Sequence, residues 1–270
     1  MTGSDIVFER RGVAGLVTLN RPKALNALTL AMVRELHPQL RAWAEDPEVR
    51  HVVVTGAGDR AFCAGGDIRQ LYDWGLAKDP AFIEFYRTEY LLNIFIKRYP
   101  KPYIAIMNGI TMGGGVGVSV HGSHRVATEK LTFAMPETGI GLFPDVGGTY
   151  FLPRCPGKLG MFLGLTGHRL KAADAIIAGV ATHFVPAEDC SDLIDRLAGA
   201  DNVDDCLAQL VQSPGAAPLA EHKNDIDKHF AGKSVEDITA SLHSDGSDWA
   251  LKVAGIMATK SPTSQKITHE

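Results

Sequence analysis

The chain has 270 residues, of which 45% are hydrophobic and 21% charged, a composition typical of a globular protein with one large core. A formal net charge of −4 provides no basic field, so no nucleic-acid partner is expected. No run of about eighteen apolar residues is present, which predicts no membrane span. The N-terminal residues lack the apolar core of a secretory signal, and the four cysteines are widely spaced. Together these features predict reduced thiols and a cytoplasmic location.

Strands and one helix are predicted in the first 55 residues. Residues 7–11 and 15–19 flank a glycine turn and predict a β-hairpin. Thr29 is placed to cap a helix that runs to about Glu45, with apolar residues at helical spacing. The β-branched run at 51–55 predicts a strand buried on both faces, as in a parallel sheet.

A first glycine turn follows at residues 61–67. Gly65 and Gly66 make a flexible backbone point that could offer an N–H group to a ligand, although such a pair is more often only a turn. Asp67 is placed to cap a helix that begins directly after it. Cys63 is interpreted as a buried, inert thiol rather than a nucleophile, because no histidine lies beside it in the sequence.

Residues 81–98 predict an amphipathic helix that carries one unexpected carboxylate. Glu89 falls on the apolar stripe, between Phe85 and Leu92. A carboxylate is costly there unless it is paired or functional. Glu89 is therefore either a site residue or a stripe-edge residue that meets an arginine.

The second glycine turn, Gly113–Gly115, follows a predicted strand at 103–107 and precedes a predicted buried helix at 116–120. A glycine turn that opens a helix leaves backbone N–H groups without intrahelical partners. Such groups can bind a phosphate or the oxyanion of a carbonyl under attack. Tight helix packing explains the glycines equally well, so the spacing alone leaves both interpretations open.

Two carboxylates follow within the next thirty residues. Glu137 comes directly after the apolar run 131–135, and Asp145 lies in a turn-like stretch at 143–148. Paired carboxylates after a buried strand are suited to general acid–base chemistry.

The remainder of the chain predicts more helices. Segments 158–167 and 172–178 have helical patterns and 181–185 is extended, which together with the earlier strands indicates an α/β core over 1–186. The composition becomes more polar from residue 187, so 187–270 is predicted to be a helical C-terminal region. Within it a linker is expected at 213–218, and helices at 234–242 and 249–257. The histidines have no metal-ligand spacing, so they are interpreted as structural and no metal site is predicted; they are His121, His124, His168 and His183.

Several of these stretches together resemble the crotonase (enoyl-CoA hydratase/isomerase) superfamily. They are residues 20–27 (NRPKALNA), 61–67 (AFCAGGD), 109–117 (GITMGGGVG) and 135–148 (MPETGIGLFPDVGG). The match is nearest to the branch that hydrolyses 3-hydroxyisobutyryl-CoA, with RVATEK at 125–130, GLFPDVGG at 141–148 and SPTS at 261–264.

The resemblance implies a spiral of ββα turns that holds an acyl-CoA thioester. It implies that the backbone N–H groups of Gly66 and Gly114 form an oxyanion hole and that Glu137 is the catalytic carboxylate. Asp145 stands where hydratases carry glycine, and Glu89 lines the acyl pocket.

The same resemblance places the segment that contacts CoA at Lys23, Ala24 and Leu25, with Ala64 and Asp67 also on the substrate side. It implies no cofactor, since coenzyme A is part of the substrate, and it is compatible with a homo-oligomer. The branch usually continues with several helices over the acyl-CoA site, whereas this sequence ends soon after SPTS.

One departure from the hydratase pattern distinguishes the branches. Hydratases carry a second catalytic glutamate where this chain has Gly117. Glu137 and Asp145 suit attack on the thioester instead, with Glu137 either as general base or as a nucleophile that forms an anhydride. The predicted function is therefore hydrolysis of 3-hydroxyisobutyryl-CoA, or a close short-chain 3-hydroxyacyl-CoA, in valine breakdown. The alternatives are a hydratase or isomerase of the same fold, and a catalytically weak acyl-CoA-binding protein.

Overall fold

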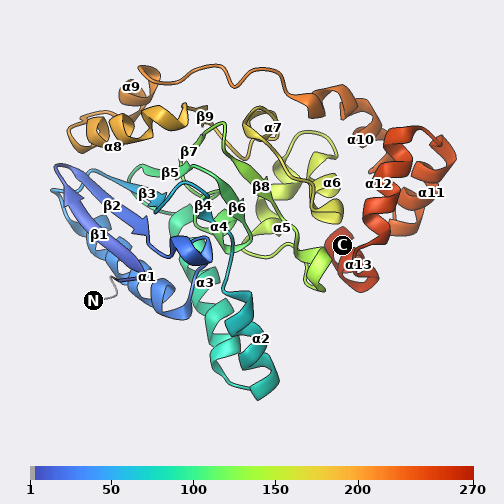
Figure 1. Cartoon of the computed structure of the whole chain (residues 1–270), viewed down its shortest axis with the longest axis horizontal. Coiled ribbons are helices and arrows are strands. Elements are labelled where there is room, and N and C mark those ends of the chain that lie inside the picture. Colours follow the sequence, from blue (N-terminus) through green and yellow to red (C-terminus); the bar gives the residue numbers. More distant parts are fainter. Residues whose placement is uncertain (1–3) are drawn as a thin grey trace.

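The structure is a computed structural model that describes residues 4–270. A six-stranded sheet in the order β1-β2-β3-β5-β7-β9 forms its centre (Figure 1). The first two strands are antiparallel and the other pairs are parallel. These strands are β1 (Ile6–Arg11), β2 (Ala14–Leu19), β3 (His51–Gly56), β5 (Tyr103–Met107), β7 (His124–Ala127) and β9 (His183–Phe184). The predicted hairpin and the predicted parallel strand at 51–55 are confirmed.

A second, parallel sheet contains β4 (Ala61–Cys63), β6 (Ile110–Met112) and β8 (Thr132–Ala134). Along the chain, β3, β5 and β7 of the large sheet are followed by β4, β6 and β8 of the small one, and each pair then leads to helical turns. The ββα spiral implied by the family resemblance is therefore confirmed. Because the small strands are parallel and adjacent, the loops that follow them meet at one edge of the sheet.

The helices after the small strands begin at these loops. Strand β4 leads to α2 (Ile68–Ala77) and α3 (Ala81–Lys97), β6 to α4 (Gly114–Gly117), and β8 to a 3-10 turn at Glu137–Ile140. The two predicted caps are confirmed, since Thr29 accepts a hydrogen bond from Met32 N–H at the start of α1 (Leu30–Glu45) and Asp67 accepts one from Gln70 N–H.

The C-terminal helices gather at two ends of the molecule (Figure 1). Residues of α8 and α9 share one hydrophobic cluster with β5 and β7, while those of α10 to α12 join the main core with α6. The helices at the two ends are α8 (Cys190–Ala198), α9 (Val203–Ala208), α10 (Lys223–His229), α11 (Val235–Asp245), α12 (Asp248–Ala258) and α13 (Pro262–His269). Between them lie α5 (Gly148–Phe151), α6 (Leu159–Thr166) and α7 (Ala172–Ile177). The division of the chain at residue 186 stays a prediction.

The helix predicted at 116–120 is wrong in its extent. Helix α4 is a single turn that ends at Gly117, and residues 118–121 form turns. The hydroxyl of Ser119 donates to the carbonyl of Gly115 at 2.8 Å, a local side-chain contact of the kind that competes with continued helix. No helix within residues 4–270 is long and apolar enough to cross a membrane.

Candidate active site

Two backbone N–H groups converge at the edge of the small sheet. Leu28 and Gly66 form an isolated parallel β-bridge. Its hydrogen bonds run from Leu28 N–H to Gly65 O and from Asp67 N–H to Leu28 O, so the Gly66 N–H is not used in the bridge. Gly114 opens α4, where the first N–H has no intrahelical partner. A Cβ atom built on Gly114 would lie 3.3 Å from the Gly66 nitrogen. The two N–H groups are thus neighbours, as an oxyanion hole requires.

Glu137 lies at the third loop of the same edge. Its side chain is 4% exposed, and its Oε2 atom has no hydrogen-bond partner among the described residues. Burial, helped by the nearby charge of Asp145, raises the pKa of the Glu137 carboxyl to about 8. Its Oε1 atom is 3.3 Å from the position that a Cβ on Gly113 would occupy, so glycine there leaves room beside the carboxyl group.

Glu89 and Asp145 complete a group of three buried carboxyls. Glu89 is 2% exposed, and burial followed by the charges of Asp145 and Glu137 holds its pKa well above the usual range. Asp145 accepts a hydrogen bond from the hydroxyl of Tyr90 at 2.8 Å. Burial raises the pKa of Asp145 as well, while the Tyr90 hydrogen bond lowers it.

These groups line a small cavity of about 90 Å³. No lysine or arginine of the described chain lines it, which is why the carboxyls have no counter-ion to lower their pKa values. The residues on its wall include Ala64, Gly65, Gly66, Phe85, Tyr86, Glu89, Gly113, Gly114, Glu137 and Asp145. The structure therefore brings together the two glycines predicted to form an oxyanion hole, the three acidic residues and Ala64.

The remaining predicted substrate residues lie outside this cavity wall. Lys23 and Ala24 are exposed in a 3-10 turn, and Leu25 adopts a left-handed conformation with φ of 51°. The Leu25 carbonyl accepts a hydrogen bond from Ala64 N–H at 3.0 Å, which ties this loop to the cavity rim. Asp67 is engaged by Arg21 at 3.0 Å and by its cap on α2, so its contacts are structural.

A larger cavity of about 520 Å³ shares Asp145 with the small one. Its wall contains Tyr90 and Asn93 from α3, neither of which the sequence singled out. Asn93 lies one helical turn after Glu89, at a spacing that the amphipathic pattern of α3 could have revealed. Tyr90 had no such signal, because its contact joins residues 55 positions apart.

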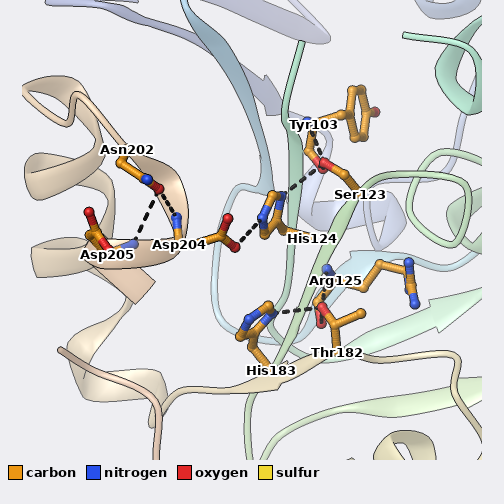
Figure 2. Close-up of polar contacts among 9 residues, drawn as sticks. All are labelled: Tyr103, Ser123, His124, Arg125, Thr182, His183, Asn202, Asp204 and Asp205. Atoms are coloured by element: carbon orange, nitrogen blue, oxygen red, sulfur yellow. Dashed lines mark hydrogen bonds and ion pairs between the residues drawn. The ribbon is translucent and has the colours of Figure 1, made fainter. Parts of the chain in front are cut away.

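The histidines make contacts that suit structural roles. His124 is held between the hydroxyl of Ser123 and the Asp204 carboxylate, and its ring stacks on His183 with centroids 5.8 Å apart (Figure 2). The ring of His121 meets the Val146 carbonyl at 2.7 Å. Within residues 4–270 no group of three or more His, Cys, Asp or Glu side chains could hold a metal ion.

Cys63 is fully buried and donates to Gly65 O, and burial raises the pKa of its thiol to about 12. A thiol so far from ionisation is a poor nucleophile, in agreement with the prediction of an inert cysteine.

Comparisons with known proteins show to which family the chain is similar. A sequence model of the enoyl-CoA hydratase/isomerase family matches residues 14–270. The mitochondrial 3-hydroxyisobutyryl-CoA hydrolase of Danio rerio is 54% identical over 98% of this chain and 72% of its own length, and that of Homo sapiens is 48% identical over 98% and 71%. A solved structure named carnitinyl-CoA dehydratase, from Mycobacterium thermoresistibile, has a TM-score of 0.95 and 46% identity, covering 98% of this chain and 78% of its own.

These relatives correct one prediction. The sequence predicted a cytoplasmic protein, but the curated relatives carry mitochondrial names, so the cytoplasmic location is contradicted. The absence of disulfide spacing indicates only a reducing environment, and it does not distinguish one reducing compartment from another. The match over residues 14–270, with the curated relatives and the spiral fold, shows that this chain belongs to the enoyl-CoA hydratase/isomerase family.

Proposed function

We propose that this chain hydrolyses the thioester bond of 3-hydroxyisobutyryl-CoA, or of a close short-chain 3-hydroxyacyl-CoA, to give the free acid and coenzyme A. The observation that carries the proposal is the buried carboxyl of Glu137, whose Oε2 atom has no partner among the described residues and which lines one cavity with Gly66 and Gly114. The curated relatives named for this hydrolysis support it. The small cavity suits the few heavy atoms of a short acyl group.

In the reaction the thioester oxygen accepts hydrogen bonds from the Gly66 and Gly114 N–H groups. A water molecule attacks the carbonyl carbon while the Glu137 carboxylate takes its proton, and negative charge develops on the bound oxygen. The carbon–sulfur bond then breaks, and the proton held by Glu137 passes to the departing sulfur. Direct attack by Glu137, with an anhydride that water then opens, uses the same groups and reaches the same products.

The pKa values fit this division of roles. A Glu137 pKa of about 8 makes the carboxyl a stronger base than an exposed glutamate and still allows it to ionise near neutral pH. The pKa of Glu89 lies well above its usual range, which favours the neutral acid, a form that can donate a hydrogen bond. Asp145 receives a hydrogen bond from Tyr90, which favours its charged form.

Hydration of a double bond is disfavoured by the surroundings of Gly117. A Cβ atom there would lie 2.8 Å from both Asn93 Nδ2 and Val146 Cβ. No side chain fits at this position without displacement of its neighbours. The second glutamate that the resemblance assigns to hydratases is therefore absent and has no space.

The first experiment follows CoA release from 3-hydroxyisobutyryl-CoA with a thiol reagent, for the wild type and Glu137→Gln. Glutamine keeps the size of the side chain but cannot take a proton, so we expect turnover to fall by at least about 100-fold. Hydration of crotonyl-CoA by the wild type is the parallel measurement. Strong hydration with no CoA release would contradict the proposal, and near-normal hydrolysis by Glu137→Gln would remove Glu137 from its role.

A further inference from the structure

A buried amide lies beside the site without a partner. Asn93 is 3% exposed, and neither Nδ2 nor Oδ1 makes a hydrogen bond to any described residue. Buried polar groups in folded proteins are almost always paired, because each unpaired group loses its hydrogen bonds to water. An amide left open on both atoms therefore indicates a group that is paired by something outside the protein chain.

The position of Asn93 relates it to the acyl end of the site. It lies on α3 one turn after Glu89, so both side chains face the same direction from the helix. Glu89 packs against Gly114, since a Cβ atom built on Gly114 would lie 2.5 Å from Glu89 Oε1. Asn93 packs against Gly117 in the same way, with 2.8 Å between such a Cβ atom and Asn93 Nδ2. Asn93 also lines the larger cavity, and Asp145 belongs to the walls of both this cavity and the small one.

The chemistry of an amide differs from that of the three carboxyls. An alcohol carries one donor hydrogen and acceptor lone pairs. An ionised carboxylate can only accept, and the pKa of Glu89 favours a neutral acid that can also donate. An amide offers a donor on nitrogen and an acceptor on oxygen at every pH, and both atoms of Asn93 lack a partner among the described residues. Asn93 can therefore satisfy both halves of a hydroxyl group.

We propose that the Asn93 amide binds the 3-hydroxyl group of the acyl substrate and makes the enzyme selective for hydroxylated over plain acyl groups. The inference rests on the proposed hydrolysis and adds a specificity-determining residue to it. In the proposed binding mode the hydroxyl points toward the larger cavity, which Asn93 and Asp145 both line, while Glu137 and the glycine N–H groups act on the thioester itself. Asn93 thus acts in recognition, and the bond-breaking steps do not depend on it.

The test compares 3-hydroxyisobutyryl-CoA with isobutyryl-CoA, which lacks the hydroxyl. Asn93→Leu keeps the shape of the side chain and removes both polar atoms. We expect kcat/KM for the hydroxylated substrate to fall about tenfold or more, while kcat/KM for isobutyryl-CoA stays within about twofold. Thermal stability of the variant should equal or exceed that of the wild type, because an open amide is gone.

Two further variants control the result. Leu91→Ala changes an exposed residue of the same helix and should leave the ratio of the two substrates unchanged. Asn93→Ser, with a shorter side chain, should lose the same selectivity and covers the case in which Asn93→Leu does not fold. Equal losses for both substrates, or an unchanged ratio, would show that Asn93 is structural and overturn the inference. Failure of the wild type to release CoA from either thioester would instead overturn the proposed hydrolysis, and the inference with it.

Discussion

Glu137 is the residue at which function and stability oppose each other most directly. Its carboxyl group is buried with two other acidic residues and has no cation beside it. A basic carboxyl is useful for attack on a thioester, but the same environment penalises its charged form.

The linkage between pKa and folding gives a prediction for Glu137→Gln. The pKa of this carboxyl is about 8 when folded, against an ordinary value of 4.5. Because the folded state holds the proton more tightly, the Glu137 carboxyl contributes stability to the fold. This contribution is complete below pH 4.5 and is lost as pH rises through 8. Glutamine is neutral at every pH. We therefore expect the free energy of unfolding at pH 9 to be higher for the variant than for the wild type, by more than about 1 kcal/mol. Near pH 4 we expect the difference between the two proteins to be smallest.

Thermal unfolding measured from pH 4 to pH 9 checks this difference. Glu35→Gln, at an exposed position of α1, is the control and should leave the pH dependence unchanged. A Glu137→Gln variant that parallels the wild type at all pH values would contradict a raised pKa in the folded state.

Gly114 gives a second prediction at this scale. A Cβ atom there would lie 2.5 Å from Glu89 Oε1, the tip of a side chain, so the fold can adapt but the oxyanion hole cannot stay in place. We expect Gly114→Val to fold and to lose hydrolysis by about 100-fold or more, since one oxyanion donor typically contributes about 2.7–4 kcal/mol. Circular dichroism and CoA release are the measurements, and a fully active variant would exclude Gly114 from the site.

At the scale of elements, the packing of α3 on α4 leaves no space for a side chain at position 117. The glycines of the one-turn helix α4 let α3 approach closely enough for its polar side chains to reach the cavity. Asn93 and Val146 then occupy the space over Gly117. The absence of a glutamate at position 117 therefore goes together with neighbours that leave no space for one.

This packing predicts the outcome of Gly117→Glu. The substitution restores the hydratase pattern in the sequence, yet we expect no gain in crotonyl-CoA hydration, because Val146 Cβ cannot move as a flexible side chain can. Overpacking should lower stability by about 1–3 kcal/mol. Hydration followed by the absorbance of the enoyl thioester checks the first point, and chemical denaturation the second. Hydratase activity in this variant would show that position 117 alone separates the two reactions.

Element-level patterns also explain how much could be predicted. Strands buried on both faces and side-chain caps such as Thr29 and Asp67 are local signals, and both were confirmed. Glu89 is buried, as its place on the apolar stripe indicated, while its role in a site stays a prediction. The contact between Tyr90 and Asp145 was not predictable, because it depends on how distant segments pack. The roles of Glu137 and Gly66 came from resemblance to a family, and they remain predictions for experiment.

Across the whole molecule, buried groups have pKa values shifted in two opposite directions, and the two sets lie in different places. The three raised carboxyls lie at the edge of the small sheet. Burial lowers the pKa of several histidines elsewhere, among them His51 on β3. Rising pH lowers stability through the carboxyls, and falling pH lowers it through the histidines. We therefore expect a plot of stability against pH to have a maximum between an acid limb and an alkaline limb.

The acid limb can be assigned to particular histidines. His51 is 2% exposed, and its Nε2 atom contacts the Leu197 carbonyl at 2.9 Å, so the ring ties β3 to α8. Burial lowers its pKa below 6.5, so the unfolded chain takes up this proton first and stability falls as pH drops below 6.5. His51→Gln can still donate to the carbonyl but does not titrate. We expect its unfolding temperature to fall less steeply than that of the wild type from pH 6.5 to pH 5.

The two limbs should also be independent of each other. His51 and Glu137 share no hydrogen-bond partner among the described residues; His51 lies on β3 of the large sheet, and Glu137 lies in the 3-10 turn after the small sheet. Effects at such sites usually add within about 0.5 kcal/mol. The double variant His51→Gln, Glu137→Gln should therefore show both changes at once, a flatter acid limb and a flatter alkaline limb. His243→Gln, at an exposed position, is the matched control for the histidine. If the double variant flattened only one limb, the His51 and Glu137 sites would be coupled in unfolding.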